Sequence, residues 1–202
     1  MRDSPASAAG DPRDDRLDDR RQPAVTLLRP QPGMASRYLA AVRRSRELHR
    51  PWVAAPDSLA AYRAYLERLE TDNYLGYFVH TGDGELAGVI NVNEIVHGAF
   101  CSGYLGYYGF APHTGRGYMR AGMRKVITRA FGVHRLHRLE ANIQPDNERS
   151  RRLAASLGFR LEGFSPRYLK IRGRWRDHER WAITREEWPP GRSGSAEWPH
   201  WR

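Results

Sequence analysis

The most constraining feature of this chain is a glycine-rich turn, GFAPHTGRGYM at residues 109–119. Residues 103–110 before and within it read as a β-strand, whereas residues 118–131 carry apolar side chains at helical spacing. A helix that begins directly after such a turn presents unpaired backbone N–H groups and a partial positive charge, which together suit a phosphate group. The turn therefore predicts an α/β fold with a phosphate site where this strand meets this helix.

The rest of the chain continues the alternation of strands and helices. Strands are expected at residues 25–30, 74–80, 85–95, 103–110 and 138–143, and in a final hairpin of residues 160–171 and 174–184. Helices are expected at residues 34–48, 59–69, 118–131 and 148–157. The predicted order is β-α-α-β-β-β-α-β-α-β-β, an α/β domain with a mixed sheet. Residues 85–95 are apolar on both faces, which predicts a strand in the middle of that sheet.

Composition predicts one domain at residues 25–188, because 202 residues with 40% hydrophobic side chains suffice for one core. Residues 1–24 are rich in Pro, Ala, Asp and Arg, so they are expected to form a disordered tail. Residues 189–202 are expected to form a second, loose tail. Neither a signal peptide nor a membrane span of ~20 apolar residues is visible, and we expect a cytoplasmic protein without membrane contact.

Charge and cysteine content narrow the classes of function. The formal net charge is +10, which favours polyanionic partners such as nucleic acid or ribosomes, although an arginine-rich composition also accompanies GC-rich coding. Arg135 and Arg138 form a basic turn that is either simply solvated or contacts RNA or the ribosome. Cys101 is the only cysteine, which excludes an internal disulfide and a cysteine-based zinc cluster. The histidines lack metal-ligand spacing, and no metal site is predicted.

Two common phosphate-binding motifs do not fit the glycine-rich turn. A P-loop requires Lys followed by Ser or Thr after the last glycine, where this chain has Tyr118 and Met119. The dinucleotide fingerprint requires a third Gly or Ala at the position of Arg120, and it opens a parallel βαβ unit rather than following an antiparallel hairpin.

The turn resembles the pyrophosphate loop of the GNAT superfamily of acetyl-CoA-dependent N-acetyltransferases, which reads Gln/Arg-x-x-Gly-x-Gly/Ala. The corresponding residues here are Thr114, Gly115, Arg116, Gly117, Tyr118 and Met119. Thr114 and Met119 depart from the general pattern. A plain tight turn into a helix is the alternative interpretation.

A second block, ANIQPDNERSRRLAASLGFRLEG at residues 141–163, resembles the strand and helix that follow in the same family. It supplies Asn142 at the end of a strand, then Pro145, Asn147 and Ser150; taken alone, the last two could be only a helix cap. The segments at residues 88–110 and 168–183 are similar to the ribosomal-protein-alanine N-acetyltransferases of the RimJ/RimL type, in which Met is common at the last loop position. The resemblance covers residues 25–188 and implies a mixed, mostly antiparallel central sheet flanked by helices.

The resemblance implies that acetyl-CoA is the acetyl donor and that acetyl passes directly to an amine. The expected cofactor-binding residues are Phe110, Ala111, Thr114, Gly115, Arg116, Gly117, Tyr118, Met119, Asn142, Asn147 and Ser150. The family uses a backbone N–H of the strand before the loop to bind the oxyanion, which by position lies around Phe110.

For the catalytic base we favour Glu94, at the end of the central strand, where partial burial would raise its pKa. The alternative for Glu94 is a solvated hairpin acid. For the proton donor to the thiolate, Ser150 matches the serine of RimL-type members, and Tyr104, Tyr107 or Tyr108 could replace it.

The acceptor is not readable from the sequence. Resemblance suggests the N-terminal α-amine of a protein such as a ribosomal protein. Loops around Trp52, Asn93–Glu94 and the final hairpin are expected to build the acceptor site. A small-molecule amine (an antibiotic, polyamine or amino acid) and a non-catalytic protein that binds nucleic acid or ribosomes are the alternatives. The protein is expected to be a monomer or a homodimer.

Overall fold

The structure is a computed structural model that describes residues 22–188. The tails predicted at residues 1–24 and 189–202 lie outside the described residues, except for residues 22–24. The strands are β1 (Val25–Leu28), β2 (Leu75–Thr81), β3 (Leu86–Val96), β4 (Ser102–Gly109), β5 (Arg138–Ile143), β6 (Arg160–Ile171) and β7 (Arg174–Thr184). The helices are η1 (Pro32–Met34), α2 (Ala35–Arg44), α3 (Arg46–His49), α4 (Leu59–Arg68), α5 (Tyr118–Gly132) and α6 (Glu148–Ser156).

The seven strands form one sheet in the order β1-β2-β3-β4-β5-β7-β6. Every neighbouring pair is antiparallel except β4–β5, which is parallel. The predicted α/β class with a mixed, mostly antiparallel sheet is therefore confirmed, and β3 lies inside the sheet as its apolar faces predicted. The final hairpin turns at Arg172 and Gly173, whose φ angles of 49° and 80° are those of a two-residue type I′ turn.

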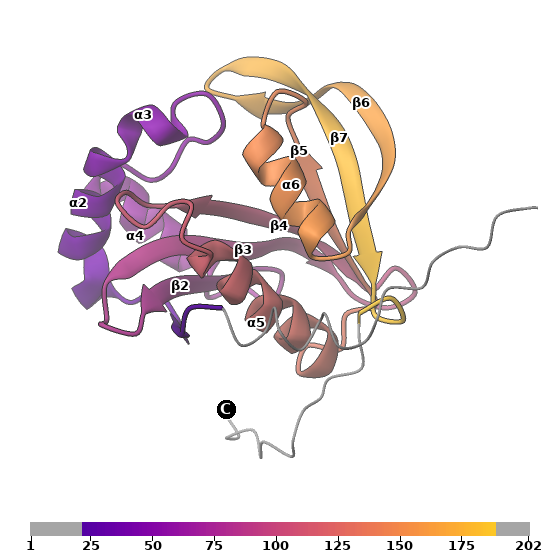
Figure 1. Cartoon of the computed structure of the whole chain (residues 1–202), viewed down its shortest axis with the longest axis horizontal. Coiled ribbons are helices and arrows are strands. Elements are labelled where there is room, and N and C mark those ends of the chain that lie inside the picture. The colour runs from indigo at the N-terminus through magenta and orange to yellow at the C-terminus, as the bar shows by residue number, and fades with distance from the viewer. Residues whose placement is uncertain (1–21, 189–202) are drawn as a thin grey trace, which may run out of the picture.

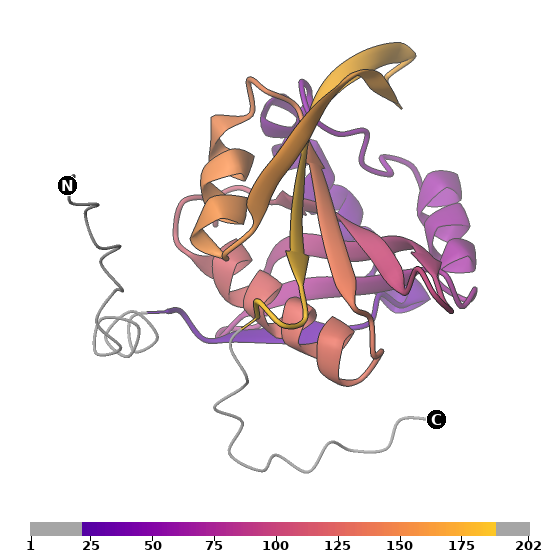
Figure 2. The same ribbon diagram turned by 90° about the vertical axis from the view of Figure 1, so that its right-hand side faces the viewer.

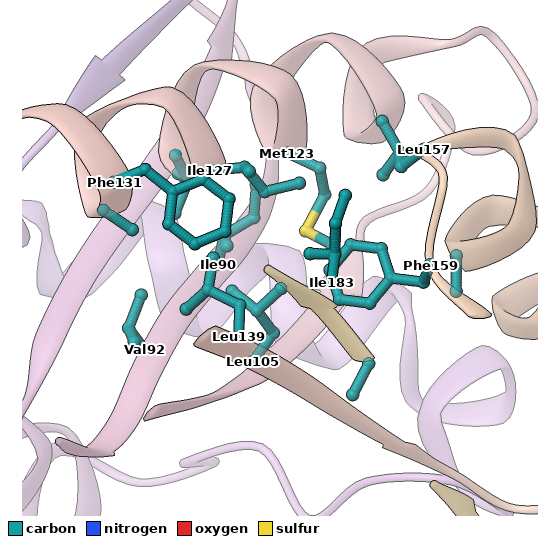
Figure 3. Close-up of a cluster of buried hydrophobic side chains, with 14 of the residues drawn as sticks. Ile90, Val92, Leu105, Met123, Ile127, Phe131, Leu139, Leu157, Phe159 and Ile183 are labelled. Atoms are coloured by element: carbon teal, nitrogen blue, oxygen red, sulfur yellow. The ribbon is translucent and has the colours of Figure 1, made fainter. Parts of the chain in front are cut away.

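Two cores lie on opposite faces of the sheet, and Figure 2 shows helices on both sides of it. Alternate residues of one strand enter different cores, as the period of two requires: Ile90 packs under α5, whereas Val89 packs under α2 and α4. Figure 3 shows the larger core, where Met123 and Ile127 of α5 meet Ile90 and Leu139 of the sheet. Both cores include residues of β3, and β4, which leads into the glycine-rich turn, lies between them.

The helix predicted at residues 34–48 is divided into α2 and α3 at Ser45. Ser45 is 1% exposed, and its Oγ accepts a hydrogen bond of 3.0 Å from the N–H of Ala111, just after β4. The sequence contains no proline or glycine here, so only this contact across the fold reveals the break. The break places α3 against the end of β4.

Strands β4 and β5 pair over only four residues each, from Ser102↔Arg138 to Leu105↔Ala141. Beyond this point the two strands diverge, which Figure 1 shows as a V between β4 and β5. The N-terminus of α5 follows the end of β4, and the N-terminus of α6 follows the end of β5. The opening between the two strands, called the β4–β5 opening below, therefore lies among the predicted site residues.

Candidate active site

The glycine-rich turn leads directly into the first turn of α5. Gly115 and Gly117 have φ angles of 78° and 81°, a region that favours glycine. Gly117 is the N-cap of α5, and within the described part of the chain no side chain caps the helix there. The first N–H groups of a helix have no intrahelical acceptors. The turn therefore has the geometry of an anion site, with exposed Arg116 beside it.

Met119 fixes the start of α5 against the sheet. A Cβ added to Gly88 of β3 would lie 2.2 Å from Met119 Sδ and 2.8 Å from the carbonyl oxygen of Tyr108. The absence of a side chain at Gly88 thus makes room for Met119. This packing gives the last position of the turn a structural role in holding the helix N-terminus at the end of β4.

Phe110 cannot supply the oxyanion donor that the sequence suggested, because its N–H donates to the carbonyl of Ala87 at 2.8 Å. Its ring is fully buried, and the N–H of Ala111 is bound to Ser45. Groups along an antiparallel strand alternate between its two edges. The N–H of Tyr107 therefore points to the edge that β5 has left, into the β4–β5 opening.

Tyr107 and Ser150 meet at this opening. Their hydroxyl groups lie 2.6 Å apart, and Ser150 occupies the first turn of α6. Asn147 caps that helix by accepting a bond of 3.2 Å from the N–H of Ser150, so the capping role considered for this pair is real. Burial raises the pKa of Tyr107 to about 12, against the opposing effect of its bond to Ser150. Both hydroxyl groups thus carry protons at neutral pH.

The other two tyrosines considered as proton donors lie elsewhere. Tyr108 points to the opposite face, where its hydroxyl is 2.9 Å from that of Tyr38. Tyr104 lies near Glu94, whose charge, after burial, contributes to raising the pKa of Tyr104. Of the three, only Tyr107 contacts Ser150.

Asn142 of β5 has an unpaired acceptor. Its Oδ1 atom is buried and has no hydrogen-bond partner among the described residues 22–188. Buried polar atoms are nearly always paired, because leaving one unpaired is costly. An unpaired Oδ1 at the end of β5 therefore suits a ligand that carries an N–H group.

A pocket of about 200 Å³ lies on the α4 side of the sheet, called the α4-face pocket below. Residues 106–108 of β4 form part of its wall, together with Asn91 and Asn93 of β3, Tyr65 and Arg68 of α4, and Val53, Ala54 and Pro56 of the preceding loop. The hydroxyl of Tyr65 donates to Asn91 Oδ1 at 2.7 Å. Among the described residues 22–188, those that line the pocket include one cation, Arg68, and no carboxylate. It reaches Tyr107 from the face opposite to α5 and α6.

Glu94 lies outside this pocket. It occupies an irregular position of β3 with φ 47°, its side chain is exposed rather than partly buried as expected, and it accepts a hydrogen bond from Tyr74. That bond is the main cause that raises the pKa of Tyr74 to about 12. Glu94 is therefore held near the rim, and its role as the base stays a prediction.

Sequence reasoning missed Ser45 and His49, which together hold the end of β4. His49 is 4% exposed, and its Nε2 lies 2.8 Å from the carbonyl oxygen of Gly109, so it donates. Its Nδ1 is buried without a partner among the described residues, and burial lowers its pKa. His49 is thus a neutral imidazole with a free lone pair. The only sequence signal is that Ser45 and His49 are four residues apart on one helical side.

The two arginines of the predicted basic turn, Arg135 and Arg138, have different surroundings. Arg138 contacts two carboxylates, Glu140 at 2.8 Å and Glu162, which together raise its pKa. Arg135 is exposed. The charge of Arg138 is thus largely compensated, and an RNA contact at this turn stays a prediction.

Two further features bear on the class of protein. No helix within residues 22–188 is both long and apolar enough to cross a membrane. The same residues contain no group of three His, Cys, Asp or Glu side chains that could hold a metal ion.

Comparison with known proteins identifies one family. The model of the acetyltransferase (GNAT) domain matches residues 25–160. The ribosomal protein uS5-alanine N-acetyltransferase of Escherichia coli (strain K12) is 40% identical over 119 residues, which cover 59% of this chain and 61% of that protein. The chain thus matches about six-tenths of the length of that relative.

Solved structures have the same fold. RimJ of Mycobacterium smegmatis in complex with CoA-disulfide has a TM-score of 0.76 and 29% identity, covering 82% of this chain and 84% of that one. The ribosomal-protein-S5-alanine acetyltransferase of Vibrio fischeri has a TM-score of 0.73 and 24% identity, covering 82% and 96%.

Proposed function

The chain belongs to the GNAT acetyltransferase family, and we propose that it transfers acetyl from acetyl-CoA directly to the N-terminal α-amine of a protein. One observation carries the proposal. The turn before α5 directly follows β4, and Tyr107 of the same strand lines the α4-face pocket at the β4–β5 opening. A donor bound at the turn and an acceptor bound in the pocket would meet at this residue.

The residues present fit acetyl-CoA. Its pyrophosphate matches the uncapped N-terminus of α5 with Gly115, Arg116 and Gly117. Its pantetheine arm carries amide N–H groups, which match the unpaired Oδ1 of Asn142. When bound, the thioester supplies the activated acetyl group. The proposed cofactor residues are thus those of the turn, with Asn142, and with Asn147 as the residue that orients Ser150.

Groups of this chain are placed to stabilise the negative charges that develop on the carbonyl oxygen and on the leaving sulfur during transfer. The N–H of Tyr107 takes the place predicted for Phe110 as the oxyanion donor, because it points into the opening. Ser150 donates a proton towards the leaving sulfur, and Tyr107 holds the serine hydroxyl at 2.6 Å. The high pKa of Tyr107 keeps its own proton in place for that bond.

Proton removal from the amine is assigned to Glu94, as predicted from the sequence, either directly or through water. An N-terminal α-amine has a pKa of about 7.7–8.0, so a good part of it is already neutral near pH 7.5, and the base need not be strong. A lysine side chain would require far more assistance. The exposed position of Glu94 is compatible with this modest task.

Charge in the α4-face pocket separates the candidate acceptors. A polyamine carries several positive charges and needs carboxylates, whereas this pocket contains Arg68 and no carboxylate. A peptide N-terminus brings one charge that is partly lost at neutral pH, together with backbone groups that Asn91 and Asn93 can bind. This contrast, and the uS5-alanine acetyltransferase named among the relatives, supports a protein N-terminus over a polyamine.

The test begins with calorimetric titration of the purified protein with acetyl-CoA, followed by thiol release with peptides that begin with Ala or Ser. Stoichiometric binding and turnover of these peptides, with little turnover of spermidine or of an N-terminally blocked peptide, is expected. Turnover of spermidine alone would favour the small-molecule alternative. Absence of acetyl-CoA binding at millimolar concentration would reject the enzyme and favour a non-catalytic binding protein.

A further inference from the structure

The end of the β6–β7 hairpin carries an uncompensated positive charge. This segment, residues 167–176, is called the hairpin tip below. All of its cations are exposed: Arg167, Lys170, Arg172, Arg174 and Arg176. The tip contains no Asp or Glu. Figures 1 and 2 show the hairpin reaching beyond the body of the domain.

Arginines in the body of the domain behave differently. Arg151 binds Glu179 at 2.9 Å, and Arg160 binds both Glu162 and Glu187. Within the described part of the chain, no cation of the hairpin tip forms an ion pair. The acid that follows the tip, Asp177, uses its carboxylate to accept the backbone N–H of Arg167 at 2.7 Å. The tip thus presents its positive charge to solvent.

Two aromatic side chains accompany these cations. Trp175 is 60% exposed and Tyr168 is 40% exposed. Trp175 lies directly across the hairpin from Lys170, so the indole and the ammonium share one face. Arg174 and Arg176 lie across from Ile171 and Leu169, so their side chains alternate to the other face of this two-stranded ribbon. Exposed aromatic rings close to cations suit single-stranded nucleic acid, because bases stack on the rings while phosphates meet the charges.

The hairpin tip lies at the same end of the domain as α3, which precedes the loop of the α4-face pocket. Figure 1 shows the tip arching towards α3. The charge of Arg172 contributes, after burial, to the lowered pKa of His49 in that helix. A molecule bound at the tip would therefore lie at the end of the domain where α3 leads into the loop that lines the α4-face pocket.

We propose that the hairpin tip binds single-stranded RNA and thereby presents the N-terminus of an RNA-bound acceptor protein to the α4-face pocket. The second half of this statement rests on the proposed function. The cations contact phosphates, whereas Trp175 and Tyr168 stack on bases. Binding therefore depends on structure and charge more than on base sequence. This assignment moves the expected RNA contact from Arg135 and Arg138 to the tip.

The test measures the anisotropy of a fluorescein-labelled 16-nucleotide single-stranded RNA against protein concentration at several salt concentrations. The triple variant K170Q/R174Q/R176Q should lower the slope of log affinity against log salt by about 2, since each lost phosphate contact removes ~0.7. The control variant R43Q/R44Q/R63Q removes the same charge from exposed positions of α2 and α4, and should change the slope little. W175A should weaken binding about 5- to 150-fold with an unchanged salt slope.

Four outcomes would overturn the proposal: no RNA binding, an equal loss in the two triple variants, tighter binding of an acidic peptide or duplex DNA than of single-stranded RNA, or full affinity in W175A. Circular dichroism and acetyl-CoA titration of each variant confirm that the fold is kept. The RNA assay contains neither acetyl-CoA nor acceptor. Its failure is therefore distinguishable from a failure of acetyl transfer.

Discussion

Replacing Asn142 with leucine should make the protein more stable and its binding of acetyl-CoA weaker. The two effects come from one atom. Asn142 Oδ1 is buried without a partner in the described structure, so the folded protein bears the desolvation of an acceptor and gains no hydrogen bond for it. A leucine of similar size removes that atom and adds apolar contacts.

The size of each effect follows from the energetics of hydrogen bonds. A buried unpaired acceptor destabilises a fold by about 1–3 kcal/mol. Even the lower value would raise the melting temperature of a domain of this size by ~2–4 °C. In the complex with acetyl-CoA the same atom is proposed to accept one amide N–H, and loss of that bond of about 0.5–1.5 kcal/mol would weaken binding roughly 2- to 13-fold.

The assay combines thermal unfolding without ligand and calorimetric titration with acetyl-CoA. Asn91→Leu is the matched control, because Asn91 Oδ1 is paired with the Tyr65 hydroxyl at 2.7 Å. That change should leave a buried hydroxyl unpaired and lower the melting temperature. If Asn142→Leu is also less stable and binds acetyl-CoA as tightly as the wild type, Oδ1 has a structural partner such as a bound water, and the reasoning fails.

Four further changes test the rest of the site. Gly117→Trp should abolish detectable acetyl-CoA binding, because φ is 81° there and even a Cβ would meet Pro23 at 3.3 Å; normal affinity by calorimetry would remove the turn from the site. Ser150→Ala should lower kcat up to about 100-fold with little change in KM for acetyl-CoA, and a wild-type rate of thiol release would exclude Ser150 as the donor. Glu94→Gln should lower turnover and shift its pH profile while acetyl-CoA affinity is kept; equal rates at every pH would show that Glu94 is not the base. Hydrogen bonding to Arg138 and Arg160 lowers the pKa of Glu162 from 4.5 to about 2, so its stabilising effect is present above pH 4.5 and is lost as pH falls towards 2; Glu162→Gln should therefore be less stable at pH 7, and urea titrations in which that difference persists at pH 2 would contradict the assignment.

Local patterns predicted most elements because the forces that set them are local. The strand at β3 was recognisable from apolar residues on both faces, and the hairpin turn from Arg172-Gly173. The break at Ser45 was not, because its cause is a hydrogen bond to Ala111, which lies 66 residues away. Helix propensity and hydrophobic periodicity depend on neighbouring residues, so they do not predict such a contact.

The site residues also differ in whether their roles depend on local or on distant contacts. Asn147 next to Ser150 was predictable as a helix N-terminus, since a cap depends on residues three apart. The oxyanion donor was misplaced at Phe110 because the edge to which an N–H points depends on which residues β3 and β4 pair, and a shift of one residue reverses the answer. The ion pairs of Arg138 divide in the same way, since Glu140 is a near neighbour in the sequence whereas Glu162 lies 24 residues away.

Few hydrogen bonds cross the β4–β5 opening. A ligand that binds there could therefore stabilise the fold. Tyr107 on β4 reaches Ser150 on α6, and the side chain of Gln144 after β5 reaches the carbonyl oxygen of Trp52 at 3.4 Å. Apart from these bonds, the edges of β4 and β5 beyond Leu105 and Ala141 do not pair with each other. A ligand that bonds to Tyr107 on one side and Asn142 on the other would replace the missing ladder. Acetyl-CoA should therefore bind along this edge like an added strand, next to the proposed proton donor Ser150 and the proposed oxyanion donor of Tyr107.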